Sequence, residues 1–158
     1  MKKQNGFSLI ELLIVVAIIL IIAAIAIPNL MRSKMAANEA SAVGSLRTIN
    51  TAEVTYSTEF PATGFGPLAS LGGVGCTAAT VATVAAACLV DNVLATGTKS
   101  GYVFVATAAG GPPAVTYTSS ANPQVPNQSG TREFCSDQSG VIYYGASAGT
   151  CVQGTNPL

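Results

Sequence analysis

Residues 7–27 read FSLIELLIVVAIILIIAAIAI. It is apolar apart from Ser8 and Glu11. As a helix, its twenty-one residues would measure roughly 31 Å, which is long enough to cross the hydrocarbon core of a bilayer. The segment therefore predicts a membrane-spanning helix near the start of the chain.

Glu11 is the unusual residue of this segment. A carboxylate inside an apolar helix costs on the order of 2.5 to 3.5 kcal/mol on insertion scales, so it calls for a partner or a function. Two simpler explanations stay open near a helix end: the side chain reaches the membrane interface, or it stays protonated.

The string GFSLIEL at residues 6–12 follows a short basic leader, MKKQN. This arrangement resembles the processing signal of type IV prepilins and of the related pseudopilins of type II secretion. In that family a membrane peptidase cuts after the glycine and methylates the new amino terminus. The resemblance implies a cleaved leader at residues 1–6, cleavage between Gly6 and Phe7, and N-methylation of Phe7. It also implies that Glu11, at the spacing of the family's acidic residue, acts in filament assembly.

Physical chemistry gives Phe7 and Glu11 a reason to pair. Cleavage would place a charged α-amino group at Phe7 in lipid, where it is as costly alone as the carboxylate of Glu11. If Phe7 of one copy meets Glu11 of another, two unpaired charges become an ion pair, which fixes axial register and adds attraction.

An ordinary secretory signal peptide is a competing interpretation of the same segment. Residues 24–26 read AIA, a small-x-small site at the end of an apolar run, and cleavage there would start the mature chain at Ile27. The apolar run is about twice the length of a typical signal-peptide core, and it contains Glu11. Both observations argue against this alternative.

The helix is expected to continue beyond the membrane. Pro28 would kink it, yet in the family that the chain resembles the helix usually runs past a proline at this place. Over residues 29–58, apolar residues at mostly helical spacing predict a stripe that packs on a sheet. The apolar members are Met35, Val43, Leu46, Ile49, Ala52 and Tyr56, and the polar positions are Arg32, Lys34, Asn38, Glu39, Arg47 and Glu53. Gly44 is expected to mark a bend or a close contact, and Pro61 ends the helix.

The remainder of the chain predicts a connecting region and a small sheet. Residues 61–100 are rich in Gly, Ala, Thr and Val and are expected to form the connecting loop region. Within it, a short helix with a stop at Gly97 is expected. Its apolar side is Leu89, Val90, Val93 and Leu94. Short β-branched or aromatic runs between turn residues then predict three or four antiparallel strands. They lie at 101–107, 114–119, 131–135 and 141–144.

The expected fold class is therefore α+β. A long N-terminal helix, membrane-spanning over 7–27 and amphipathic over 28–60, packs on a small antiparallel sheet to form one core. The sheet and a C-terminal cysteine loop occupy 101–158. The resemblance to type IV pilins implies the same pilin roll, and it covers residues 1–60 more strongly than the rest.

Four cysteines lie outside the apolar segment, at spacings that do not fit a zinc ribbon. In a chain that enters a membrane, two disulfides are the natural interpretation. We favour Cys76 with Cys88 and Cys135 with Cys151, because each pair closes a short loop that is worth roughly 3 kcal/mol in the chain-entropy model. The other pairings and four free thiols remain alternatives. In the pilin family, a loop such as 136–150 often provides exposed surface for subunit contact or adhesion. Equally, the disulfide that closes this loop could serve only to stabilise the fold.

The composition argues against catalysis. Seven basic and seven acidic residues balance, only 9% of residues are charged, and histidine is absent. This excludes a strongly basic nucleic-acid surface and removes the usual acid–base group and the commonest metal ligand. We therefore expect no enzyme activity, no small-molecule substrate, no cofactor and no metal site. DNA binding stays open, but nothing in the sequence supports it. Asp137 with Ser136 and Ser139 falls short of the roughly six to eight oxygens that calcium takes.

These patterns favour a structural subunit of a type IV pilus, cleaved and N-methylated by a prepilin peptidase and polymerised through its N-terminal helix. The resemblance implies a role in attachment, twitching motility or DNA uptake. The expected partners are further copies of the chain in a helical filament, the peptidase, the inner-membrane assembly machinery and, before assembly, membrane lipid. The chain would first be a single-pass inner-membrane protein and then part of an extracellular filament. The alternative is a pseudopilin in a periplasmic filament of a type II secretion system.

Overall fold

The computed structural model describes residues 7–73, 76, 81–146 and 149–158. Its first element is a helix, α1, which runs from Leu9 to Glu59 with Pro28 inside it. The chain divides into two compact units, Met1–Lys34 and Met35–Leu158, and the division falls within α1. The prediction that the helix continues past Pro28 is confirmed.

In the first unit, α1 leaves its apolar side chains uncovered. The large aliphatic residues from Leu9 to Met31 are between 46% and 78% exposed. Among the described residues, α1 is the one helix that is long and apolar enough to cross a membrane. A surface of this kind is stable only where lipid or other protein covers it.

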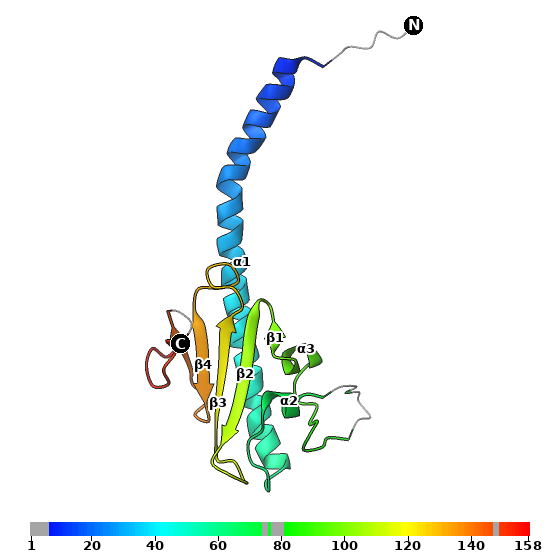
Figure 1. Cartoon of the computed structure of the whole chain (residues 1–158), viewed down its shortest axis with the longest axis vertical. Coiled ribbons are helices and arrows are strands. Elements are labelled where there is room, and N and C mark those ends of the chain that lie inside the picture. Colours follow the sequence, from blue (N-terminus) through cyan, green and yellow to red (C-terminus); the bar gives the residue numbers. More distant parts are fainter. Residues whose placement is uncertain (1–6, 74–75, 77–80, 147–148) are drawn as a thin grey trace. The chain divides into compact units, whose positions relative to one another are not determined.

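The second unit is an antiparallel sheet with the later part of α1 packed against it (Figure 1). Five strands lie in the order β1-β2-β3-β4-β5, so each strand pairs with its neighbours in sequence. Their bounds are β1 Thr98–Lys99, β2 Tyr102–Ala109, β3 Thr116–Pro123, β4 Glu133–Asp137 and β5 Ile142–Gly145. The register aligns Phe104 of β2 with Ala121 of β3, and Ala121 with Phe134 of β4. The predicted α+β fold class is confirmed.

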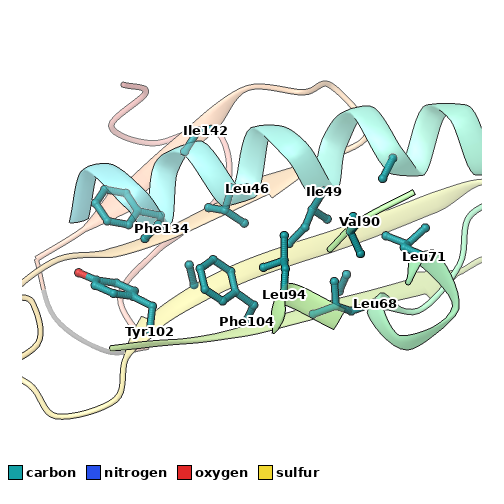
Figure 2. Packing of buried hydrophobic residues seen from close by; sticks show 14 of the residues in the cluster. Leu46, Ile49, Leu68, Leu71, Val90, Leu94, Tyr102, Phe104, Phe134 and Ile142 are labelled. Atoms are coloured by element: carbon teal, nitrogen blue, oxygen red, sulfur yellow. The ribbon is translucent and has the colours of Figure 1, made fainter. Parts of the chain in front are cut away.

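The core of the second unit lies between α1 and the sheet. Figure 2 shows Leu46 of α1 above Phe104 of β2 and beside Phe134 of β4, with Ile49 one helical turn farther along α1. All four side chains are at most 3% exposed. Burying an aliphatic or aromatic side chain of this size contributes about 1.5 to 3 kcal/mol, so the stripe on α1 holds the helix on the sheet.

Two short helices cover one edge of this core. Helix α2 runs from Leu68 to Leu71 and helix α3 from Asn92 to Ala95. The Asp91 side chain accepts a hydrogen bond from the Leu94 N–H at 3.1 Å, an N-cap that begins α3. Gly97 ends it with a φ of +81°, a conformation that glycine adopts without strain.

Several local predictions need correction. The region predicted as a connecting loop contains α2, and the short helix begins at Asn92 rather than Leu89. Val93, assigned to the apolar side of that helix, is 57% exposed. The four predicted strands are present, with β1 as a fifth strand that the sequence pattern missed.

Three positions on α1 also differ from the prediction. Glu39 and Glu53, assigned to its polar positions, are 7% and 0% exposed. Gly44 is exposed, and a side chain added there would meet no described atom within 4 Å, so the predicted close contact is wrong. The amphipathic pattern therefore located the apolar stripe but not the buried acids beside it.

Candidate functional site

The start of α1 carries Phe7, Ser8 and Glu11. Gly6, the other residue of the predicted cleavage site, lies outside the described residues. Phe7 precedes the helix and is 77% exposed. The Ser8 N–H donates to Oε2 of Glu11 at 2.9 Å, and the Leu12 N–H donates to the Ser8 carbonyl at 3.2 Å. Glu11 therefore satisfies a backbone donor that the helix itself leaves without a partner.

This contact is one half of a capping box. In that motif a Ser stands at the N-cap, and a Glu three residues later accepts from the N-cap N–H, as Glu11 does from Ser8. A carboxylate in the first turn also interacts favourably with the positive end of the helix dipole. The sequence prediction missed the role of Ser8, although the spacing S-x-x-E at residues 8–11 signals it.

Further along the segment, Pro28 lies inside α1. A proline has no N–H, so the helical hydrogen bond to the carbonyl four residues earlier is not made there. One turn later, the Ser33 hydroxyl donates to the Asn29 carbonyl at 3.0 Å. The local loss of a hydrogen bond fits a bend at Pro28, which remains a prediction.

The four cysteines form two disulfides, Cys76–Cys88 and Cys135–Cys151. These are the two pairs predicted from the sequence, where each pair was favoured because it closes a short loop. Cys135 is on β4 and Cys151 follows β5, so the second bond attaches the C-terminal segment to the sheet.

A buried carboxylate supports the same C-terminal loop. Glu133 is 5% exposed and accepts from the N–H groups of Gly149 and Cys151, the latter at 2.5 Å. A carboxylate that accepts backbone hydrogen bonds makes contacts stronger than neutral ones. The loop is thus fixed by a covalent bond and by charge-assisted hydrogen bonds. Residue spacing alone gave no signal for Glu133, because its partners are far away in sequence.

A second buried acid, Glu39 of α1, ties the helix to the segment before β4. It accepts from the Thr131 N–H and hydroxyl, both at 2.9 Å, and from Nε of Arg132 at 2.8 Å. Nη2 of Arg132 completes an ion pair at 2.8 Å. Burial alone would raise the pKa of Glu39, but the hydrogen bonds from Thr131 and Arg132 outweigh burial and lower it.

Asn50 forms a polar network between α1 and the sheet. Its Nδ2 donates to the Ser136 hydroxyl at 2.8 Å, and its Oδ1 accepts from the Tyr117 hydroxyl at 3.1 Å. Ser136 in turn donates to the Val141 carbonyl at 2.8 Å. The Ser136 hydroxyl is thus bound within this network and forms no hydrogen bond with Asp137 or Ser139. The N–H and the hydroxyl of Ser139 both donate to Oδ1 of Asp137 within the turn. The residues considered for a cation site are therefore not brought together.

An open groove of about 590 Å³ runs beside this network. It lies between α1 and the turn from β4 to β5, and it is lined by Arg47, Asn50, Thr51, Val54, Thr55, Tyr117, Gln138, Ser139 and Gly140. Arg47 is its one charged lining residue. The lining offers no nucleophile paired with a base, so the groove has no arrangement for acyl or phosphoryl transfer.

Comparisons with known proteins match parts of the chain. Residues 1–27 match the family profile described as the prokaryotic N-terminal methylation motif. Over 57 residues, 36% of this chain, it is 44% identical to the type IV major pilin protein PilA of Myxococcus xanthus. Over 39 residues, 25% of this chain, it is 56% identical to the type IV wide pilus major component PilA4 of Thermus thermophilus. The matched segments span 26% and 30% of these two relatives. No solved structure matches the chain.

Proposed function

We propose that this type IV pilin-like chain is a structural subunit of a type IV pilus, anchored in the membrane by α1 and then polymerised through the same helix. Over 36% and 25% of its length the chain is similar to two proteins named as major pilus components, and residues 1–27 match the methylation motif. The proposal includes cleavage between Gly6 and Phe7 by a prepilin peptidase and N-methylation of Phe7. The role is structural rather than enzymatic.

The observation that carries this proposal is the uncovered apolar surface of α1 in the first unit. Large aliphatic side chains from Leu9 to Met31 are exposed on all sides of the helix. Burial stabilises such a surface by about 25 cal/mol per Å², so water is the least favourable surrounding for it. Lipid can cover it while the chain is a monomer, and the equivalent helices of other copies can cover it after assembly.

Glu11 then has two successive partners. In the single chain, its Oε2 accepts from the Ser8 N–H. Cleavage creates a charged amine at Phe7, and in an apolar surrounding this amine and a carboxylate of a neighbouring copy compensate each other. We propose that this pair sets the axial register between copies and adds attraction, while the Ser8 contact orients the carboxylate before assembly.

Substitution of Glu11 tests the assembly step. Glu11→Ala removes the acceptor, and Glu11→Gln keeps a polar side chain of the same shape without the charge. Electron microscopy of cells should show filament yield reduced by about tenfold or more in both variants, because even about 1.4 kcal/mol of lost attraction is a factor of ten. Glu59→Ala, which alters an exposed carboxylate at the far end of α1, is the matched control and should assemble normally.

Normal filament yield and subunit spacing in Glu11→Ala would contradict the pairing of Phe7 with Glu11. Immunoblots of the membrane fraction must show equal chain levels, so that a missing filament is not explained by degradation.

Deletion of the whole chain distinguishes a pilus subunit from a pseudopilin. Loss of surface filaments supports the proposal, whereas intact surface filaments with failed protein secretion support the pseudopilin alternative.

A further inference from the structure

Glu53 is a buried acid that the filament proposal does not use. It lies on α1 within the second unit and is 0% exposed. Its Oε2 accepts from the Gly66 N–H at 3.0 Å. Among the described residues, its Oε1 has no hydrogen-bond partner. A carboxylate removed from water with a single donor is poorly compensated when it is charged.

The surroundings of Glu53 bring no positive charge to it. In the described part of the chain, neither salt bridge includes Glu53. Burial, and next the negative charge of Glu53, raises the pKa values of Tyr56 on α1 and Tyr117 on β3. The hydroxyls of these two tyrosines donate to the Val84 carbonyl and to Asn50, respectively. The segment around Gly66 contributes a backbone N–H. Asp137 of β4 adds a further negative charge near Tyr117. Burial, and next the charge of Glu53, raises the pKa of Tyr117 to about 12.

Burial raises the pKa of Glu53 itself to about 7, against the opposing effect of the Gly66 N–H. The carboxyl group is therefore neutral in the folded chain below neutral pH and ionises within the physiological range. Once the carboxyl group is charged, contact of water with Oε1 lowers the free-energy cost of that charge. The carboxyl group is fully enclosed, so water reaches it only after a local opening. The segment at Gly66 contacts it from outside α1 through the Gly66 N–H.

The segment around Gly66 is held by a limited set of contacts. The Phe65 N–H donates to the Ala114 carbonyl at 3.1 Å, and the Ala114 N–H donates to the Thr63 carbonyl at 2.8 Å. Gly66 also packs closely on Tyr56, because a Cβ added at Gly66 would lie 2.8 Å from the tyrosine ring. The N–H groups of Thr63 and Gly64 also donate to the Phe60 carbonyl, at 2.9 and 3.0 Å, and the ring centroids of Phe65 and Tyr117 lie 4.9 Å apart. These backbone hydrogen bonds and ring contacts must loosen for the segment to open.

We propose that the contact between Glu53 and Gly66 is a pH-sensitive device that closes residues 63–66 onto α1 while the carboxyl group is protonated and opens them when it ionises. The opening is local, because the core around Leu46 and Ile49 does not include the carboxyl group. This inference stands apart from the filament proposal and can fail or hold independently of it.

Amide hydrogen exchange of the full chain in detergent micelles tests the device. Labelling at about pH 5.5 and about pH 8.5, corrected for intrinsic exchange, should show protection of residues 63–66 falling roughly thirtyfold, because the opened and closed forms differ in proton affinity. Glu53→Gln keeps an acceptor for the Gly66 N–H and cannot ionise, so its protection should change little over the same range. Glu59→Gln, the control, should keep the behaviour of the unaltered chain.

Two results would overturn the proposal: protection that does not change with pH in the unaltered chain, or an equal fall in Glu53→Gln. A second measurement covers the case in which Glu53→Gln does not fold. Carbon-13 NMR of the Glu53 carboxyl in the unaltered chain should titrate near pH 7, and titration at the ordinary value of 4.5 would also overturn the proposal.

Discussion

Glu39 and Glu53 are both buried acids of α1, and their surroundings affect a negative charge in opposite ways. Glu39 receives hydrogen bonds from the backbone and side chains of Thr131 and Arg132, together with the positive charge of Arg132. Within the described parts of the chain, Glu53 receives one hydrogen bond, from Gly66. The number of donors, and not burial alone, decides whether the charged form is favoured.

Glu39→Gln is expected to destabilise the second unit at neutral pH by about 1.5 to 3 kcal/mol, since it removes hydrogen bonds to a charged group. The pKa of Glu39 is lowered in the folded chain, so its stabilisation is present above the unfolded value of 4.5 and is lost as the pH falls through the folded value. Urea unfolding of both chains in detergent, at neutral pH and in acid, measures this. The two chains should converge in acid, and an equal difference at both pH values would contradict the account.

The sequence predicted residues of this kind poorly. An acid in an amphipathic pattern is assigned to the solvent side, because its burial depends on partners that the pattern does not contain. Thr131 is 92 residues away from Glu39. Ser8 is different: its partner Glu11 is three residues away, so local spacing would have been sufficient to find that contact.

At the level of elements, α1 is held on the sheet by an apolar stripe and by polar contacts at defined points. Asn50 joins Tyr117 of β3 to Ser136 of β4, and all three side chains are buried. Because an unpaired buried polar group costs about 1 to 3 kcal/mol, a shift of α1 along the sheet would break these contacts and be penalised. The network therefore fixes the register between helix and sheet, and the stripe supplies most of the stability.

Leu46→Ala tests the contribution of the stripe. Leu46 is fully buried, so its truncation should lower the free energy of unfolding by about 2 to 5 kcal/mol. Val54→Ala is the matched control on the same helix, because Val54 is 57% exposed, and its effect should stay within about 0.5 kcal/mol. Thermal unfolding in detergent gives both values, and similar effects of the two variants would show that the stripe does not stabilise this unit.

The elements themselves were largely predictable from the sequence. The long apolar run and the helical spacing that follows it predicted α1, and short β-branched or aromatic runs between turn residues predicted β2 to β5. Strand β1 has only two residues, and α2 only four, so neither is long enough to show a period. Such elements form because neighbouring strands and helices provide their hydrogen-bonding and packing partners. A local sequence pattern does not show which neighbours these are.

In the whole molecule, the segment of α1 in the first unit is left uncovered by a single copy of the chain. The second unit encloses its own core, whereas the first unit exposes aliphatic side chains along α1. Apolar surface of this extent is covered by lipid or by other proteins. In the proposed assembly, a processed amino terminus at Phe7 would link the two surroundings, since it would supply the charge that Glu11 of a neighbouring copy compensates.

The intact mass of the protein in purified surface filaments tests this account most directly. The account predicts a chain that begins at Phe7, carries one added methyl group and contains two disulfides. A filament protein that retains residues 1–6 would contradict processing at Gly6, and one that begins at Ile27 would show that the apolar segment is a discarded signal peptide rather than the part of the chain that assembles.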